Sequence, residues 1–287
     1  MNAATIPDVT HHQVDVNGTT LHYVSAGSTG SPILLVHGFP ESWWAFHRLI
    51  PLLAATHRVF AVDLRGFGDS AAGEADSATA ADDLHALIAA LGVGPMHVTG
   101  QDISGGTVFR LASSYPADVL SLTAIEMGLA GFGLEGLADI THGGSWHIGV
   151  IAAPGIPELL LVGREKEFLG QFAFPAMTAV QGSITDDDID EFTRAYSRAD
   201  GWLGAVGLYR SMLAEGDELV ELSQNTGITV PVLAIGAGGG GFTEATMTAA
   251  VGHGIESVML DGVGHYAALE APERLAEAIL GFVDDIR

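Results

Sequence analysis

Apolar residues follow two patterns along the chain, and the patterns alternate. Short apolar runs lie within residues 32–39, 58–70, 96–102 and 119–128. Runs of this kind are typical of strands buried on both faces of a parallel sheet. Residues 81–92 instead repeat apolar positions at spacings of three and four, which predicts an amphipathic helix. The pattern therefore indicates an α/β protein in which strands and helices alternate.

Weaker patterns extend this prediction toward both ends of the chain. We expect further strands at residues 11–18, 20–27, 230–238 and 257–266, and further helices at residues 106–115 and 272–286. Asn17 and Gly18 separate the first two strands, and this dipeptide is a strong signal for a tight hairpin turn.

The alternation lapses between residues 129 and 225, where no run typical of a buried strand occurs. Helical patterns lie at residues 157–174, 185–199 and 201–213. An insertion that follows the carboxyl end of a strand lies above the crevice in which α/β sheets bind ligands. We therefore predict a core domain made of residues 1–128 and 226–287 and a helical cap, or lid, made of residues 129–225.

Composition narrows the class of protein. The 287 residues are 48% hydrophobic and 16% charged, as in a globular protein, and the net charge of −24 disfavours nucleic acid and anionic membranes as partners. The absence of cysteine excludes disulfides and thiolate chemistry. Residues 1–18 lack the pattern of a signal peptide and no apolar stretch is long enough to span a membrane, so we expect a cytoplasmic protein.

The stretch TGQDISGG at residues 99–106 carries the first chemical signal. It has the spacing G-x-S-x-G of a strand-to-helix elbow that presents a nucleophilic serine, but Asp102 stands in the place of the serine. Carboxylates can act as nucleophiles that form covalent intermediates. The ordinary alternative is an aspartate that caps the following helix. We interpret Asp102 as the nucleophile.

Two further motifs lie in the same order as in a known family. They are HGFPES at residues 37–42 and GVGHY at residues 262–266. With the elbow at residues 100–106, they make the chain resemble the α/β-hydrolases, and within them the epoxide hydrolases and the related haloalkane and haloacetate dehalogenases. The resemblance implies the α/β-hydrolase fold, a mostly parallel, doubly wound sheet with an inserted helical lid.

The resemblance also implies roles for individual residues. His265 would be the general base, and it would activate water rather than Asp102, because a carboxylate is already charged at neutral pH. The backbone N–H groups of Phe39 and Ile103 would form the oxyanion hole, which stabilises the tetrahedral intermediate when water attacks the ester.

The charged partner of the base is identified by what one loop lacks. Many α/β-hydrolases carry this acid after the strand at residues 230–238, but residues 237–241 read AGGGG. Glu244 is expected inside the next helix, and Asp261 is expected to point elsewhere. Glu126 ends the apolar strand after the nucleophile helix, and a carboxylate there needs a partner. We predict that Glu126 supports His265; a solvated glutamate at a strand end is the alternative.

An alkoxide released from an epoxide must be protonated from the lid side. In the resembling enzymes two tyrosines, or a histidine and a tyrosine, do this, and the matching residues are His147 and Tyr209. Tyr196 is a competing tyrosine whose spacing suggests packing.

Other residues are expected to bind the substrate. Trp146, Ile148 and Pro40 are the candidates for the pocket wall. Aromatic residues of the predicted cap also suggest an apolar pocket, although a cap needs a core of its own; they are Phe132, Trp146, Phe168, Phe172, Phe174 and Trp202.

The residues that bind halide or haloacetate in the dehalogenases are missing. Ile103 and Gly106 stand where arginines would bind a carboxylate, and Ile148 stands where a tryptophan would accompany the lid histidine. Phe39 likewise replaces the halide-binding residue that often follows HG. We therefore favour a cofactor-independent epoxide hydrolase that converts a small apolar epoxide and water to a vicinal diol. A haloalkane or haloacetate dehalogenase, and a non-catalytic small-molecule-binding homologue, remain the alternatives.

Three other motifs do not indicate a ligand. Residues 185–190 (TDDDID) lack the glycine and distal glutamate of a calcium loop, and Thr185 followed by acids is typical of a helix start. The glycine run lacks the Lys-Ser/Thr of a phosphate loop, and His11 and His12 lack a third metal ligand. We predict no metal and no cofactor, and leave open whether the chain forms a homodimer.

Overall fold

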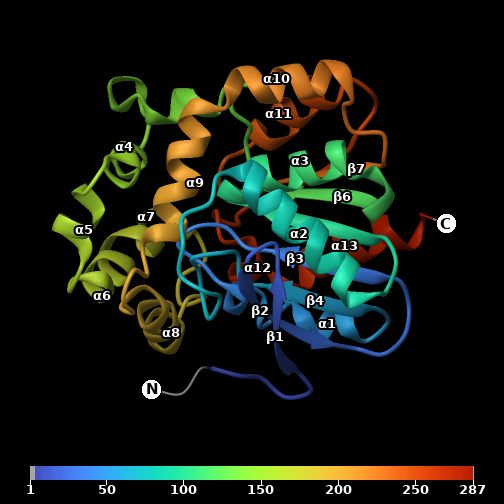
Figure 1. Ribbon diagram of the computed structural model, residues 1–287, viewed down its shortest axis with the longest axis horizontal. Helices are drawn as coiled ribbons and strands as arrows, with labels where there is room; N and C mark the ends of the chain where they lie inside the picture. The colour runs from blue at the N-terminus through green and yellow to red at the C-terminus, as the bar shows by residue number, and fades with distance from the viewer. Residues whose placement is uncertain (1–3, 287) are drawn as a thin grey trace.

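One mixed sheet forms the centre of the molecule in the computed structural model, which describes residues 4–286 (Figure 1). Within these residues eight strands pair in the order β1-β2-β4-β3-β5-β6-β7-β8. The strands are β1 (Thr10–Val16), β2 (Thr19–Ala26), β3 (Pro32–Val36), β4 (Arg58–Val62), β5 (Met96–Gln101), β6 (Val119–Ile125), β7 (Val232–Gly236) and β8 (Glu256–Met259). Strand β2 runs antiparallel to both neighbours, and the pairs from β4 to β8 are parallel. The predicted doubly wound sheet is confirmed.

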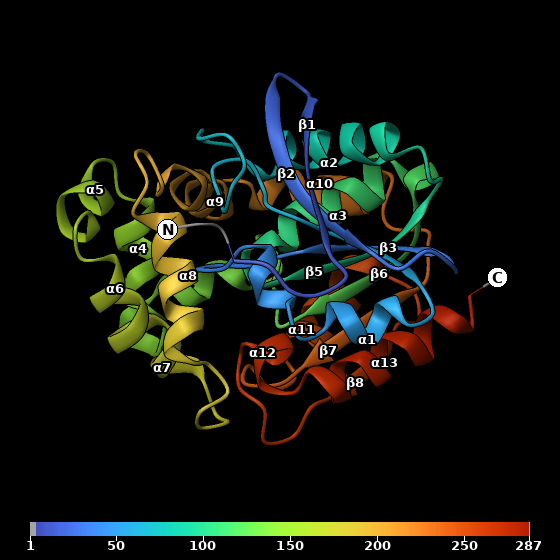
Figure 2. The same ribbon diagram turned by 90° about the horizontal axis from the view of Figure 1, so that it is seen from below.

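Helices cover both faces of this sheet, as the view from below shows (Figure 2). The helices of this layer are α1 (Ile50–Ala54), α2 (Ser77–Leu91), α3 (Gly105–Ser114), α11 (Phe242–Val251), α12 (Ala267–Glu270) and α13 (Pro272–Asp284). Short 3-10 turns are η1 (Trp43–Phe46), η2 (Asp102–Ser104) and η3 (Pro116–Asp118). Alternate residues of β3 serve opposite faces: Leu34 joins the apolar core beneath α2 and α3, whereas Ile33 and Leu35 join the core beneath α1 and α13.

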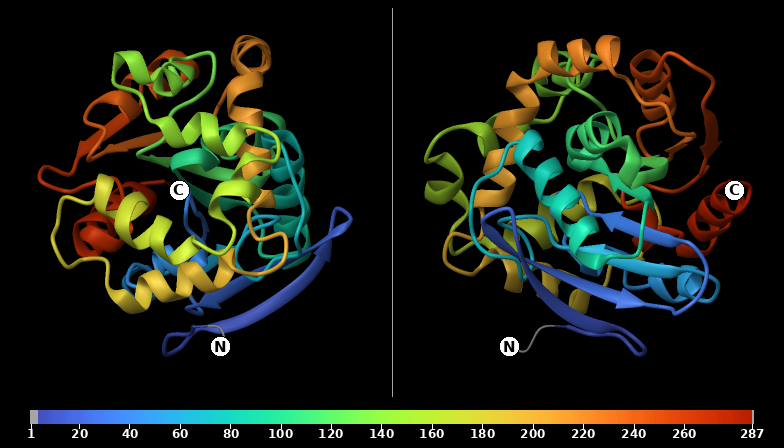
Figure 3. Two further views of the ribbon diagram at one scale, coloured as in Figure 1. Left: turned by 90° about the vertical axis from the view of Figure 1, so that its left-hand side faces the viewer. Right: turned by 45° about the vertical axis from the view of Figure 1, so that its right-hand side comes forward.

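The segment between β6 and β7 contains no strand in the described chain. Its elements are η4 (Leu134–Ala138), η5 (Ile140–His142), α4 (Trp146–Ala152), α5 (Ile156–Leu161), α6 (Glu165–Phe168), the π-helical turn η6 (Leu169–Ala173), α7 (Phe174–Met177), α8 (Asp186–Tyr196), α9 (Leu203–Ala214) and α10 (Gly216–Asn225). Helices α4 to α8 form a separate layer beside the sheet (Figures 1 and 3). Helix α9 contacts η2 at the end of β5, and α10 packs against α3 and α11, so the end of the segment lies on the sheet layer.

Local signals explain where several helices begin and end. Helix α2 starts at Ser77, before the predicted residue 81, because the Asp76 side chain accepts a hydrogen bond from Thr79 N at 2.7 Å and caps it. The predicted helix at residues 157–174 is broken into shorter pieces, and Gly163, with φ +80°, lies at the break between α5 and α6.

Two sequence interpretations of local structure are confirmed. Asn17 and Gly18, with φ +43° and +71°, form the turn between β1 and β2. Thr185 and Asp188 form a capping box at the start of α8, so the acidic run is a helix N-terminus. No helix among residues 4–286 has the length and apolar character that crossing a membrane requires.

Candidate active site

The elbow after β5 holds Asp102 in an uncommon backbone conformation. Its φ is +52°, a region that costs free energy for a residue with a side chain. The turn is closed by Ser104, whose Oγ donates to Gln101 O at 2.7 Å and accepts from Gln101 N at 2.9 Å. A Cβ on Gly100 would lie 2.6 Å from the Val108 side chain, so glycine is required there. This tight packing directs the Asp102 side chain into a cavity.

Backbone N–H groups stabilise the Asp102 carboxylate. Phe39 N donates to Asp102 Oδ2 at 2.9 Å, and a Cβ on the preceding Gly38 would lie 2.6 Å from Asp102 Cβ. Burial alone would raise the pKa of Asp102. The hydrogen bond and charge of His265, together with the amides of Phe39 and Ile103, outweigh burial and lower it. Asp102 is therefore ionised at neutral pH, with both predicted oxyanion-hole amides beside it.

His265 lies between two carboxylates. Its Nε2 is 3.4 Å from Asp102 Oδ1, and its Nδ1 is 3.2 Å from Glu126 Oε2. Burial by itself would lower the pKa of His265, but the hydrogen bonds and charges of Asp102 and Glu126 raise it to about 10. The resting site thus contains an imidazolium between two carboxylates.

Glu126 is held by the glycine loop that lacks an acid of its own. Ala237 N donates to Glu126 Oε1 at 2.5 Å, and Gly239 N donates to Oε2 at 2.7 Å. A Cβ on Gly239 would lie 3.2 Å from Oε2, and one on Gly238 would lie 2.9 Å from His265 N. The loop therefore needs residues without side chains, because the Glu126 carboxylate and the His265 backbone occupy that space.

His147 and Tyr209 face this group from the inserted segment. The Tyr209 ring centroid lies 5.1 Å from that of Phe39 and 5.9 Å from that of His147, so the three rings pack together. Burial raises the pKa of Tyr209 well above its usual value and lowers that of His147. Both are neutral at pH 7, and each can donate one hydrogen bond. Tyr196 also packs on Phe39, and its buried hydroxyl has no partner among the described residues.

A cavity of about 750 Å³ connects these groups. Its lining includes Asp102, Glu126, His265, His147 and Tyr209, together with Phe39, Ile103, Ile148, Leu134, Leu137, Met177, Met212 and Phe242. In the described chain no arginine or lysine lines it. The cavity is therefore mainly apolar, with polar groups concentrated around the Asp102 carboxylate.

Some residues expected on the pocket wall lie elsewhere. Trp146 is 43% exposed and packs on Phe172 outside the cavity, and Pro40 is buried behind Phe39, to which it is joined by a cis peptide bond. None of the six aromatic residues singled out in the inserted segment lines the cavity. Trp146, Phe168, Phe172 and Trp202 pack on one another, because the helices of the inserted segment need an apolar core of their own. Phe174 packs on Tyr266.

A buried acid in the HGFPES motif was not singled out from the sequence. Glu41 accepts hydrogen bonds from Gly38 N at 3.0 Å and Gln101 Nε2 at 3.2 Å. Complete burial raises the pKa of Glu41 to about 8, so the carboxyl group is neutral at pH 7. The motif contains Glu41, but its letters do not show that this glutamate is buried.

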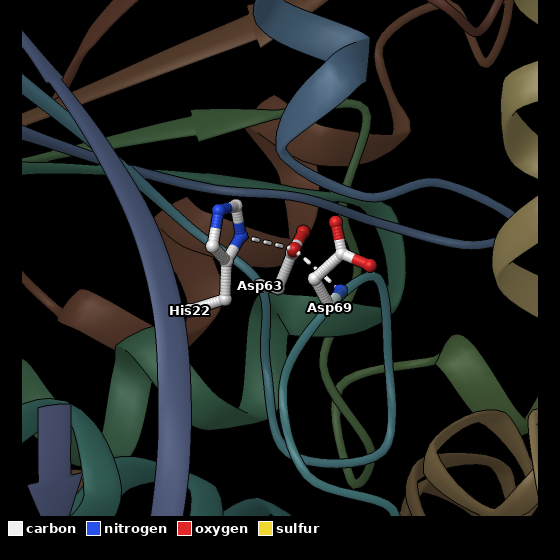
Figure 4. A group of neighbouring side chains, drawn as sticks. All are labelled: His22, Asp63 and Asp69. Carbon is white, nitrogen blue, oxygen red and sulfur yellow. Dashed lines mark hydrogen bonds and ion pairs between the residues drawn. The ribbon is translucent and has the colours of Figure 1, made fainter. Parts of the chain in front are cut away.

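A second group of titratable side chains lies at the edge of the sheet (Figure 4). His22, Asp63 and Asp69 are close enough to suggest a metal site. However, Asp63 already accepts from His22 Nδ1 at 2.7 Å, Trp43 N at 2.7 Å and Asp69 N at 2.9 Å. Both oxygens of Asp69 pair with Arg194, at 2.9 and 3.0 Å. These ligand atoms are committed to hydrogen bonds, so the group gives no support for a metal.

Comparison with known proteins agrees with this fold. Residues 31–138 match the family model described as the alpha/beta hydrolase fold. The chain is 30% identical to the soluble epoxide hydrolase of Corynebacterium sp. (strain C12), over 98% of this chain and 99% of that one. It is 38% identical to a fluoroacetate dehalogenase of Burkholderia sp. over 40% of each chain. The solved structure of the epoxide hydrolase CorEH without ligand superimposes with a TM-score of 0.85 and 27% identity, over 97% of this chain and all of that one. The chain belongs to the α/β-hydrolase family, in its epoxide hydrolase branch.

Proposed function

We propose that this protein is an epoxide hydrolase that forms an ester on Asp102 and then hydrolyses it to release a vicinal diol. Residues 129–225 would act as the cap that closes the site and supplies the acids His147 and Tyr209. The position of His265 between Asp102 and Glu126 is the observation that carries this proposal, because it accounts for both half-reactions.

In the first half-reaction the Asp102 carboxylate attacks one epoxide carbon. The C–O bond breaks, and its electron pair goes to the ring oxygen, which takes a proton from Tyr209 while His147 donates a hydrogen bond. The proton lost by Tyr209 is replaced, through water, by the proton that His265 carries. The products are a neutral hydroxyalkyl ester and a neutral imidazole, so charge and protons balance.

In the second half-reaction His265 removes a proton from water as the water attacks the ester carbonyl. The oxyanion forms next to the N–H groups of Phe39 and Ile103, where one donor can contribute about 3 kcal/mol. When the intermediate collapses, the bond between the carboxyl carbon and the diol oxygen breaks, and that oxygen takes up the second proton of the attacking water. The diol leaves, the Asp102 carboxylate is restored, and His265 keeps the first proton as an imidazolium. Water has then been added across the epoxide, and the site has returned to its starting state.

Ester formation itself prepares His265 to act as a base. Two carboxylates raise its pKa to about 10 in the free enzyme. Once Asp102 is an ester, one of these charges and its hydrogen bond are gone, while Glu126 still holds Nδ1. The pKa of His265 then falls, and the imidazole can release its proton and accept another from water.

Trapping the ester tests this mechanism directly. The variant His265→Gln, mixed with an epoxide, should accumulate a protein adduct whose added mass equals that of the epoxide, and peptide mapping should place it on Asp102. The matched variant Asp102→Asn should form no adduct. If the wild-type protein makes the diol but the His265→Gln variant never carries an adduct, the ester mechanism is wrong.

The same assays separate the alternatives. Fluoroacetate tests the dehalogenase interpretation, and release of fluoride without conversion of epoxides would favour it. The cavity argues against this outcome, because none of the arginines or lysines among residues 4–286 lines it to bind the haloacetate carboxylate. A non-catalytic binding protein would instead bind small apolar molecules equally well with Asp102→Asn, and would convert none of them.

A further inference from the structure

Besides Asp102 and Glu126, a further buried acidic side chain lies close to His265 but does not line the cavity. Glu270 ends α12, five residues after His265, and is 7% exposed. It is absent from the cavity lining, and among residues 4–286 the partners of its side chain are all backbone N–H groups. Its function must therefore concern the chain segments that it holds.

Glu270 joins two segments that are far apart in the sequence. Its Oε2 accepts from Gly264 N at 3.0 Å, and its Oε1 accepts from Tyr266 N at 3.2 Å, so it holds the residues on both sides of His265. The same Oε2 accepts from Ala179 N and Val180 N of the inserted segment, both at 2.8 Å. Four N–H donors suit a carboxyl group, whose two oxygens can both accept hydrogen bonds.

The intervening residue completes this arrangement. His265 N donates to Met177 O at 2.9 Å. The three successive N–H groups of residues 264–266 therefore all have hydrogen-bond partners. A Cβ on Gly264 would lie 2.4 Å from Met177 O and 2.5 Å from Ala179 N, which shows how closely the two segments approach. Met177 and Ala179 also line the cavity, and we call this part of its lining the cap wall. The cap wall and the backbone around His265 are therefore held by one side chain, that of Glu270.

We propose that Glu270 is a positioning residue that fixes the His265 backbone to the cap wall and so aligns the imidazole with the ester and its attacking water. This inference rests on the proposed function for the step that it affects. Asp102 is oriented by the elbow and by the N–H groups of Phe39 and Ile103, none of which bonds to Glu270. His265, whose Nε2 lies 3.4 Å from Asp102 Oδ1, contributes its charge and a proton relayed through water to ester formation, and neither contribution needs the exact alignment that attack of water on the ester does. Loss of Glu270 should therefore slow ester hydrolysis and spare ester formation.

The variant Glu270→Gln tests this because the amide keeps the size but replaces one acceptor oxygen with a donor. Glu273→Gln is the matched control, since Glu273 is exposed on α13. Rapid mixing with styrene oxide, acid quenching and intact mass measurement give the rates of both steps. We expect ester hydrolysis to slow at least about tenfold, because small misplacements of a catalytic group are costly, while ester formation stays within about twofold. The control should match the wild type.

Equal slowing of both steps, or no accumulation of ester, would overturn the proposal. Hydrogen exchange provides a readout that does not depend on catalysis. Peptides covering residues 177–180 and 262–266 should exchange faster in Glu270→Gln than in the wild type, and unchanged exchange there would also overturn it. If the wild type forms neither ester nor diol, the proposed function fails and the exchange result alone decides the role of Glu270.

A variant that keeps the charge covers the case in which Glu270→Gln does not fold. Glu270→Asp shortens the side chain by one methylene, so its oxygens cannot reach all four donors in their present positions. We expect the same unequal effect on the two steps. Equal effects on both steps in Glu270→Asp would show that the residue has only a structural role.

Discussion

At the residue scale, His265 meets opposite requirements in the two half-reactions. It carries a proton while Asp102 attacks, and it must have lost that proton before it can activate water. The two carboxylates beside it make this possible, because one of them disappears as an ester during the cycle. Glu126 remains and keeps the imidazole oriented through Nδ1, which leaves Nε2 directed toward the reacting centre.

The loss of the Asp102 charge on ester formation predicts different pH profiles for the rates of the two steps. Ester formation should be constant around neutral pH and fall above pH about 10, where free His265 loses its proton, and at acid pH below the usual range of Asp102, whose pKa is lowered. The rate of ester hydrolysis should rise with pH as His265 loses its proton. The pKa of His265 in the ester form should lie below 10, because Asp102 is then uncharged. Quenched-flow measurement of both steps from about pH 5 to about pH 11 would check this. One shared pKa in the basic range would contradict the proposed change in His265.

Replacing Glu126 by glutamine should affect the base more than the nucleophile. The variant removes the remaining negative charge at His265 Nδ1 and a charged acceptor for Ala237 N and Gly239 N. We expect steady-state turnover to fall by about 10² or more, with ester accumulating, as is typical when the support of a catalytic histidine is lost. Glu244→Gln, an exposed substitution on α11, is the control and should change turnover less than about twofold.

Some of these residues could be predicted from the sequence because they stand at fixed positions in short motifs. Asp102 and His265 occupy motif positions, and Glu126 followed from a loop without an acid; their juxtaposition is observed, and their roles remain predictions. Glu41 and Glu270 were missed because their importance lies in burial and in backbone partners distant in sequence. A single sequence does not show which glutamates are surrounded by N–H groups.

At the element scale, the glycine loop between β7 and α11 offers a test within one segment. Gly238→Ala would place a Cβ 2.9 Å from His265 N, whereas Gly241→Ala would meet nothing within 4 Å, and Gly241 has a φ of −78° that alanine accepts. We expect Gly238→Ala to lower the free energy of unfolding by about 1–3 kcal/mol and to reduce turnover. Gly241→Ala should leave the free energy of unfolding unchanged or raise it by up to about 1 kcal/mol. Urea unfolding and turnover assays of both variants check this, and equal effects would contradict it.

Strands were easier to predict than the helices of the inserted segment, for a physical reason. Strands β3 and β7 are buried on both faces, and each therefore appears as an uninterrupted apolar run. The segment from 157 to 174 has apolar residues at helical spacing, but tertiary packing and Gly163 divide it into short helices. Trp146 was expected on the pocket wall and does not line the cavity, because composition does not distinguish a core between helices from the wall of a pocket. The same ambiguity left the place of its aromatic neighbours open.

At the scale of the whole molecule, ion pairs join the inserted segment to the sheet layer. Arg194 of α8 pairs with both oxygens of Asp69 in the loop after β4, and Arg48 after η1 pairs with Asp188 at 3.0 Å. These pairs are partly buried, and they use basic residues that are scarce in this chain, since Lys and Arg total 11 against 35 acidic residues. The other acidic residues are left largely unneutralised.

This imbalance predicts how stability depends on salt. The net charge is −24, so the negatively charged side chains repel one another overall. This repulsion is strongest in the folded state, where the acidic residues are closest together. Raising ionic strength from about 0.01 M to about 0.1 M shortens the screening length from roughly 30 Å to roughly 10 Å. It should therefore reduce this repulsion more than it weakens partly buried pairs such as Arg194–Asp69. The midpoint of urea unfolding should rise with sodium chloride, while an osmolality-matched sucrose control corrects for effects unrelated to charge. A midpoint that falls with salt would mean that attractive pairs between the inserted segment and the sheet layer outweigh the net repulsion.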